Sequence, residues 1–343
     1  MSATFIPCFV GIDTSNYTTS VAVATLDEQG KFHVVANLKY PLPVKEGERG
    51  RRQSDAVFAH VKNLPEAMTD IQKVLSLGAY RICGVGYSAT PTDREGSYMP
   101  CFLTGKVAAT ALMTGLVADG REVGLYPFSH QSGHITAALY SADILQNSDI
   151  LASDILAFHV SGGTTDVLRV KWQANGYVIS IQNVGEGADL HAGQVIDRVG
   201  VMMGLDFPCG KEMERLAQAY LADNPPIKGL KVSVSDGICH LSGLENMAEK
   251  LWRETGDKGH VSAFVLSFIG KTLRRMTEQI QARYFETGGL PVVYAGGVMS
   301  NKLIRPMLTE GVDWQTYFAE PAYSADNAAG VALLCGLRWR AER

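Results

Sequence analysis

The sequence lacks the features of several common protein classes. Its six cysteines are scattered and no two form a CxxC pair, a pattern that suits free thiols in a reducing compartment better than a disulfide framework or a zinc ribbon. The first residues, MSATFIPCFVGID, have neither a basic flank nor a long apolar run. We therefore expect no signal peptide, no membrane-spanning helix and no membrane partner, and a cytoplasmic location.

The chain also has little excess charge. A formal net charge of −4 argues against a protein that coats nucleic acid by bulk electrostatics. The stretches GERGRR and GKTLRR could line a local basic groove, although solvated surface charge more often explains such runs. With 343 residues, of which 46% are hydrophobic and 19% charged, the chain exceeds the size at which one core usually stops growing, so two lobes are expected.

Strand and helix patterns follow one another in two rounds. Apolar, strand-like runs at 6–13, 20–27 and 32–40 precede a helical pattern over 54–75, which Pro65 must kink or interrupt. The second round begins with the strands ILAFHV, DVLRVKW and YVISIQNV. This recurrence predicts two related halves.

In the second round, helices are expected from Leu190 onward, and the strongest covers Val261 to Glu286. The strand PVVYAGG and a helix over 300–308 follow it.

The first hairpins of the two halves share one plan. In FVGIDTSNYTTSVAVATL and in LAFHVSGGTTDVLRV, an apolar strand meets a turn of Ser, Thr, Gly or Asn, and a second strand returns. Either turn alone is what any tight hairpin needs. As a pair they are typical of the actin-like ATPase architecture, in which each lobe directs backbone N–H groups and hydroxyls at nucleotide phosphates. Three residues of the first turn are candidates to face phosphate: Asp13, Thr14 and Ser15.

A third glycine-containing turn lies near the end of the chain, in YAGGVMSN. Gly296 and Gly297 join a buried strand to a helix, which lets the backbone lie close to a flat or anionic ligand at the helix N-terminus. A strand-to-helix turn that simply needs glycine is the alternative. Asn301 could cap the helix or bind the ligand.

Two histidines form the most specific candidate for a chemical site in the sequence. His130 and His134 stand at i and i+4 in FSHQSGHIT, which places both imidazoles on one helix face. Such a pair recurs in metal sites and needs a further ligand, for which Asp326 in YSADNAAG is the best candidate, although helix capping would explain Asp326 equally well. A zinc-protease reading is weaker, because Gln131 cannot act as the general base that HExxH supplies.

Seven motifs in one order resemble the TsaD/Gcp family, the catalytic subunit for threonylcarbamoyladenosine synthesis on tRNA and formerly the O-sialoglycoprotein endopeptidase family. They are GIDTSNYTTSVAV, SHQSGHI, HVSGGTTDV, GEGADLHAGQVIDRVGVMMGLDFPCG, LSGLE, AGGVMSNKLIR and SADNAAGVAL. The resemblance implies an α/β, actin-like (ribonuclease H-like) fold with two duplicated lobes around a nucleotide cleft. We expect the lobes at 1–127 and 128–343, with the metal and nucleotide site in the second lobe and the last helix, about 325–343, packing back on the first.

The resemblance also implies ligands. The family holds one divalent metal, iron or zinc, on residues that match His130, His134 and Asp326. It binds ATP or an acyl-adenylate, and its nucleotide-binding positions match these residues: His159, Val160, Ser161, Gly162, Gly163, Asp197, Gly210 and Asn301. No catalytic residue is assigned.

The implied activity is transfer of a threonylcarbamoyl group from its adenylate to the N6 amine of adenosine in tRNA. A second actin-like subunit or a homodimer would be a further partner. Two alternatives stay open: a divergent paralogue that binds ATP and metal but serves as a partner subunit or uses another acceptor, and a small-molecule kinase with Asp13 or Asp166 as base.

The chain departs from the family pattern around the expected acceptor. Tyr17 and Thr18 replace two acidic residues of the family's first turn, and residues 90–105 replace its short GPGL turn. Thr164 stands where the family has histidine, and Glu245 where it has lysine. These departures do not fall on the metal and nucleotide positions. The sequence therefore does not determine which acceptor the protein uses.

Overall fold

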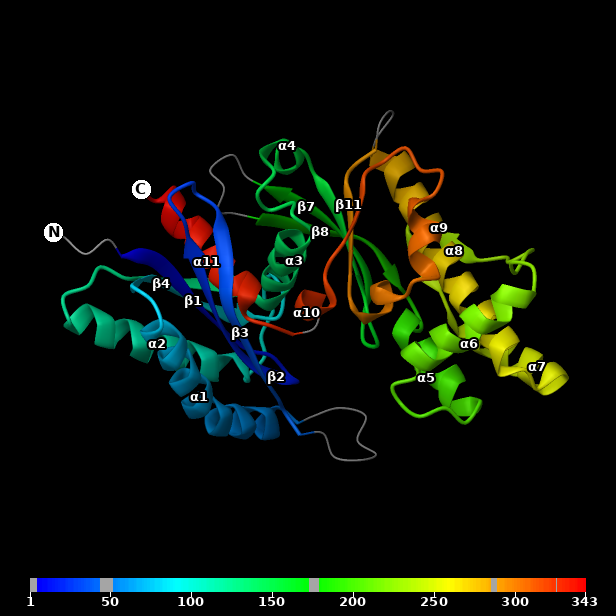
Figure 1. The fold of residues 1–343 in the computed structure, drawn as a ribbon, viewed down its shortest axis with the longest axis horizontal. Coiled ribbons are helices and arrows are strands. Elements are labelled where there is room, and N and C mark those ends of the chain that lie inside the picture. The colour runs from blue at the N-terminus through cyan, green and yellow to red at the C-terminus, as the bar shows by residue number, and fades with distance from the viewer. Residues whose placement is uncertain (1–4, 44–51, 173–178, 285–288, 325) are drawn as a thin grey trace. The chain divides into compact units, whose positions relative to one another are not determined.

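A computed structural model describes residues 5–43, 52–172, 179–284, 289–324 and 326–343. The chain forms two compact units (Figure 1). Unit 1 comprises residues 1–152, 172–180 and 322–343, and unit 2 comprises 153–171 and 181–321. The first division falls after Ala152 rather than after Pro127, because helix α3 (His130–Ser141) packs with β4, β5 and the C-terminal helix of unit 1.

Unit 1 is built on a five-stranded sheet in the order β3-β2-β1-β4-β5. The first three strands form an antiparallel meander, and β4 and β5 continue from β1 in parallel. The strands are β1 (Ile6–Thr14), β2 (Thr18–Leu26), β3 (Phe32–Pro41), β4 (Tyr80–Thr90) and β5 (Gly124–Ser129).

Both faces of the central strand are covered. Cys8, Val10 and Ile12 of β1 belong to the core formed with α1 (Gln53–Ser76) and α2 (Phe102–Ala118). Because side chains alternate along a strand, Gly11 and Asp13 point to the opposite face, where Gly11 lies against the C-terminal helix. This alternation brings Asp13 to the side of the sheet that carries the candidate site. Helix α1 runs unbroken with Pro65 inside it, so of the two expected outcomes, a kink or an interruption, the interruption was wrong.

The C-terminal helix α11 (Ala329–Ala341) packs closely on unit 1 through glycines. A Cβ on Gly330 would overlap the carbonyl oxygen of Gly133 in α3, and a Cβ on Gly11 would overlap the backbone at Ala332. Side chains at these points would push the elements apart. The glycines therefore hold α11 directly against α3 and β1.

Unit 2 repeats the plan of unit 1. Its seven-stranded sheet has the order β12-β11-β6-β7-β8-β10-β9, in which β8-β7-β6-β11-β12 corresponds to β3-β2-β1-β4-β5. The hairpin β9-β10 extends the sheet beyond β8. The expectation of two related halves is confirmed. The strands are β6 (Ile155–Val160), β7 (Thr165–Trp172), β8 (Ile179–Gly187), β9 (Ser233–Ser235), β10 (Ile238–His240), β11 (Val292–Ala295) and β12 (Thr316–Phe318).

Helices cover this second sheet around a large apolar core. The long α8 (Lys258–Tyr284) begins before the expected Val261, and positions 285–286 lie outside the described residues. The helix expected over 300–308 starts only at Ile304, because a 3₁₀ turn precedes it and Asn301 caps it. The remaining helices are α4 (Ser148–Leu151), α5 (Ala192–Met202), α6 (Gly210–Asp223), α7 (Ser242–Thr255), α9 (Ile304–Thr309) and α10 (Pro321–Ser324). Across the described ranges, none of the helices combines the length and apolarity needed to cross a membrane.

Candidate metal centre

The histidine pair lies at the start of α3. Ser129 precedes this helix in an extended conformation, and its Oγ accepts a hydrogen bond from Ser132 N at 3.0 Å. Such an N-cap fixes where the helix begins. His130 is therefore the first helical residue, and His134 lies one turn further on the same face.

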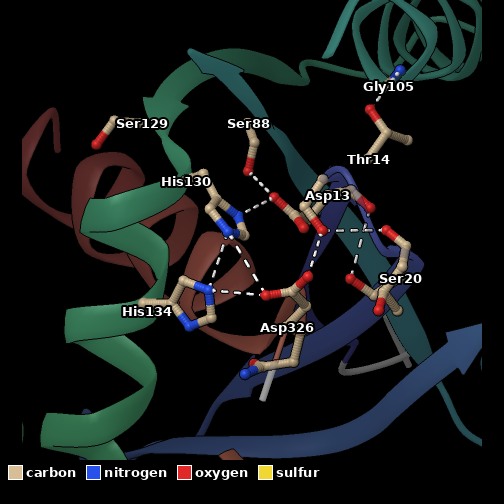
Figure 2. Close-up of polar contacts among 12 residues, drawn as sticks. Asp13, Thr14, Ser20, Ser88, Gly105, Ser129, His130, His134 and Asp326 are labelled. Carbon is tan, nitrogen blue, oxygen red and sulfur yellow. Dashed lines mark hydrogen bonds and ion pairs between the residues drawn. The ribbon is translucent and has the colours of Figure 1, made fainter. Parts of the chain in front are cut away.

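Asp326 completes a three-residue group within unit 1 (Figure 2). His134 Nε2 lies 2.9 Å from His130 Nε2 and 3.2 Å from Asp326 Oδ1. His130 Nε2 lies 3.7 Å from the same carboxylate oxygen. Two imidazoles and a carboxylate from segments almost 200 residues apart thus converge on one point.

The spacing of these atoms suits a bound cation. Ligand atoms held about 2.1 Å from a tetrahedral metal lie roughly 3.4 Å apart, and the three observed separations of 2.9, 3.2 and 3.7 Å bracket that value. Three protein ligands leave at least one coordination position for water or substrate, as in catalytic rather than structural sites.

Asp13 orients the first histidine. Its Oδ1 accepts hydrogen bonds from His130 Nδ1, at 2.8 Å, and from Ser88 Oγ. The Asp13 carboxylate accepts from Nδ1, so Nε2 is the ring nitrogen directed toward Asp326 and His134. Asp13 is fully buried, and its Oδ2 has no hydrogen-bond partner among the described residues.

Ser15, in the turn between β1 and β2, holds the other side of the group. Its Oγ donates to Asp326 Oδ2 at 2.8 Å, which leaves Oδ1 directed at the histidines. The turn is itself held by the buried His60 of α1, whose Nε2 donates to the Ser15 carbonyl at 2.9 Å while Nδ1 accepts from Thr19 Oγ1. Sequence reasoning missed His60 and Ser88, since no motif or spacing marks either residue.

The electrostatics of the group favour a cation. Burial alone would lower the pKa of His130, but the charge and hydrogen bond of Asp13, together with the charge of Asp326, raise that pKa to about 9. Burial would raise the pKa of Asp326, but the hydrogen bond from His134 and the charges of both imidazoles hold it well below its usual range. A divalent ion would satisfy the same carboxylates in place of protons.

Of the other first-turn candidates, Thr14 is tied into the fold. Its buried Oγ1 donates to the carbonyl of Cys101 at 2.9 Å and accepts from Gly105 N at 3.2 Å, which fixes the start of α2. Asp13 and Ser15 contact the histidine and aspartate group instead.

In unit 2, the segment His159 to Thr165 forms the hairpin turn between β6 and β7. Ser161 N donates to Thr164 O at 2.8 Å, and the two side-chain oxygens lie 2.7 Å apart. Gly162 and Gly163 are exposed, a Cβ on either would meet nothing within 4 Å, and neither has a left-handed φ. Neither packing nor backbone conformation thus requires glycine at these two positions. Close approach of a ligand to the backbone would require it.

The remaining unit 2 candidates have visible roles in the fold. Asp197 Oδ1 accepts from Cys209 N at 2.8 Å, just before Gly210 opens α6, and burial raises the Asp197 pKa. Asn301 Oδ1 caps α9 through Leu303 N, at 2.9 Å.

The two glycines before Asn301 differ from each other. Gly296 has φ 103°, and a Cβ there would overlap the carbonyl of Val160, whereas Gly297 borders open space. The fold itself requires Gly296, so its glycine alone does not point to a ligand.

Two sheets of one order, with helices on their faces, define the actin-like ATPase fold, and solved structures agree. The chain resembles the T. kodakarensis protein HypF with 13% identity and a TM-score of 0.58, covering 98% of this chain and 48% of that one. A full-length HypF in a phosphate- and nucleotide-bound form gives 11% identity and a TM-score of 0.52, with 98% and 46% covered. The chain thus spans about half the length of the HypF chains that it matches.

The family follows from the sequence match. Residues 54–333 match the TsaD family, tRNA N6-adenosine threonylcarbamoyltransferase, and the chain belongs to that family. A protein of that name from Methanopyrus kandleri is 27% identical over 326 residues, covering 94% of this chain and 85% of the relative. The resemblance inferred from the motifs is confirmed, and the match supports a transferase of this class and favours neither the small-molecule kinase nor the partner subunit.

Proposed function

We propose that the chain transfers a threonylcarbamoyl group from its adenylate to the N6 amine of adenosine in tRNA, with a metal held by His130, His134 and Asp326. The observation that carries this proposal is the convergence of those three ligand atoms in a chain of this family. The tRNA acceptor, a cytoplasmic location and a second actin-like subunit or homodimer belong to the same proposal.

The donor set fits iron or zinc. Two imidazoles and one carboxylate suit both ions, and the open coordination positions suit a reacting group. When bound, the metal would act as a Lewis acid and stabilise negative charge on the phosphate and carbonyl oxygens of the adenylate.

The residues of the chain set up that metal site. Asp13 keeps a proton on His130 Nδ1, so that Nε2 remains a ligand, and Ser15 turns Asp326 toward the pair. These contacts would hold the ligand atoms in position for the metal, and loss of such contacts typically costs a metal site about 10- to 100-fold in affinity.

The nucleotide would be held by unit 2. We assign the phosphate of ATP or of the acyl-adenylate to the segment His159, Val160, Ser161, Gly162 and Gly163, where the two exposed glycines would allow close approach. Asp197 has one carboxylate oxygen engaged by Cys209 N, and the other would accept from ribose hydroxyls. Gly210, Asn301 and Gly297 would complete the nucleotide contacts.

The transfer itself balances without an oxidant or reductant. The adenosine N6 attacks the carbamoyl carbon, a C–N bond forms, the C–O bond to the phosphate breaks, AMP leaves and N6 releases one proton. Holding the adenylate and the amine in this geometry would supply much of the rate.

Reconstitution with threonylcarbamoyl-adenylate and tRNA tests the function. The wild-type protein should form the modified adenosine, while His134→Ala should lose bound metal by elemental analysis and lose at least about 100-fold in rate. The matched control is His33→Ala, since His33 is an exposed histidine of unit 1 that pairs with Asp27 at 2.7 Å. No modified tRNA from metal-loaded wild type, or full activity in His134→Ala, would refute the proposal.

A further inference from the structure

We propose that Lys39 forms an anion-binding position beside the His130–His134–Asp326 group, which receives a carboxylate or phosphate of the substrate. This inference rests on the proposed function, because it assigns part of the same site.

The pairing of the strands places Lys39 on the site face of the sheet. Asp13 on β1 stands opposite Ser20 on β2, and Ser20 stands opposite Lys39 on β3. Residues directly opposite in antiparallel strands project from the same face. On the other side of β1, Ser88 of β4 donates to Asp13. Lys39, Ser20, Asp13 and Ser88 thus form one polar row across four strands, three of whose members appear in Figure 2.

This row is unusual for the interior of a sheet. Asp13, Ser20 and Ser88 are fully buried, and buried polar groups cost free energy unless they are paired. Asp13 Oδ1 accepts from His130 and from Ser88, Asp13 Oδ2 has no partner among the described residues, and Ser20 Oγ donates weakly to the Asp13 carbonyl, at 3.5 Å. The outermost member, Lys39, is the one that brings a positive charge to this face.

The ammonium of Lys39 is only partly satisfied. Its Nζ donates to the Ala322 carbonyl at 2.5 Å, which leaves two of its three N–H donors. Within the described parts of the chain it has no ion pair closer than 4.0 Å, although the charge of Asp326 acts on it. Burial lowers the pKa of Lys39 while Asp326 opposes that shift, so a bound anion would stabilise the charged form.

The charges on this side of the unit 1 sheet also favour a bound anion. Lys39 adds a positive charge on the side of the sheet that holds the carboxylates of Asp13 and Asp326. A substrate anion would neutralise it in a partly desolvated place, where such a pair is stronger than at the surface. The carboxylate of the threonylcarbamoyl group and the phosphate of the nucleotide both have this chemistry.

A purely structural role is the competing explanation. Lys39 joins β3 to α10 through Ala322, four residues before Asp326, so it could simply tether that segment. Both roles would be lost in Lys39→Met, but Lys39→Arg keeps the charge, and only the anion-binding role requires ligand affinity to depend on that charge.

Calorimetric titration of the metal-loaded, full-length protein separates these roles and the two ligand sources. N-carbamoyl-L-threonine probes the carboxylate and AMP probes the phosphate. We expect Lys39→Met to lower the affinity for one of the two probes by about 10-fold or more. Lys39→Arg should recover at least half of the lost affinity. Lys106→Met, at an exposed lysine on α2, is the matched control and should bind as wild type does.

The probe whose affinity falls in Lys39→Met shows whether the anion bound at Lys39 is the carboxylate or the phosphate. Equal affinities of Lys39→Met and wild type for both probes would overturn the inference, as would an equal loss in Lys39→Met and Lys39→Arg that tracks a fall in their unfolding free energy. These titrations need no turnover, so a wild-type protein that binds a probe through Lys39 but modifies no tRNA would refute the proposed function and leave the anion position standing.

Discussion

The carboxylate of Asp13 on β1 and the Nδ1 atom of His130 on α3 are joined by a 2.8 Å hydrogen bond across 117 residues of sequence. This contact decides which nitrogen of His130 faces the proposed metal position. The strand that bears Asp13 is held from behind by α1 and α2, so the orientation of the His130 ring is set by the core of unit 1.

Removing the charge of Asp13 should weaken metal binding without unfolding the protein. In Asp13→Asn the side chain keeps its size, but the amide holds the His130 proton less firmly, so we expect a 10- to 100-fold fall in metal affinity. Competition with a chelator measures it. Asp27→Asn, which alters an exposed carboxylate–histidine pair with His33, is the control. Unchanged affinity in Asp13→Asn would show that His130 needs no orienting partner.

A side chain at the contact between α11 and α3 should disturb fold and site together. Gly330→Ala would place a methyl group on the Gly133 carbonyl, and overpacking of this kind costs about 1–3 kcal/mol. Because Asp326 lies four residues before Gly330, metal affinity should fall as well. Denaturant unfolding and chelator competition give the two readouts. The control is Gly115→Ala in α2, where a Cβ meets nothing within 4 Å; loss of stability there too would remove the packing argument.

A substitution in the turn between β6 and β7 should affect ligand binding but not stability. A Cβ on Gly162 has open space around it, so Gly162→Ala should leave the unfolding free energy within about 0.5 kcal/mol of wild type. If a phosphate lies against the turn, the same methyl group should cost roughly 10-fold in ATP affinity, measured by calorimetry. Normal ATP affinity with normal stability would mean that the nucleotide does not contact Gly162.

Asp189 should make the stability of unit 2 depend on pH. Burial would raise its pKa, but hydrogen bonds from the Ser242 hydroxyl and from backbone N–H groups at the start of α7 lower the pKa from 3.8 to about 2. A lowered folded-state pKa stabilises the fold above pH 4, and this contribution is lost as the pH falls toward 2.

Asp189→Asn should therefore lower the unfolding free energy by roughly 0.5–1 kcal/mol at pH 7, with allowance for solvent at this partly exposed site. The difference from wild type should shrink toward zero near pH 2. Urea unfolding at several pH values measures it, and the exposed Asp313→Asn serves as control. A difference that stays constant with pH would exclude the charge as its cause.

The order of elements and the histidine pair could be predicted from the sequence because both are local. Strand alternation and the i, i+4 spacing of His130 and His134 need only a few neighbouring residues. Helix α1 is not interrupted at Pro65, because packing on the rest of unit 1 can carry a helix through a proline.

The surroundings of the histidines were beyond sequence reasoning. The contact of Asp13 with His130, and the alignment of Lys39 with Ser20 and Asp13, depend on which residues of three strands stand opposite one another. A shift of the register by one residue would turn each of these side chains to the other face. The sequence offered Asp13 only as a phosphate-facing residue or a kinase base, since nothing local points to α3.

The closing helix α11 also bears on how the protein is made. Unit 1 takes its first strands from one end of the chain and α11 from the other, with all of unit 2 encoded between them. A ribosome therefore finishes unit 2 before the residues that bring Asp326 and α11 to unit 1 exist. The surfaces of α3 and β1 that α11 covers therefore lack this partner until the end of synthesis. The group of His130, His134 and Asp326 cannot assemble until translation has passed Asp326.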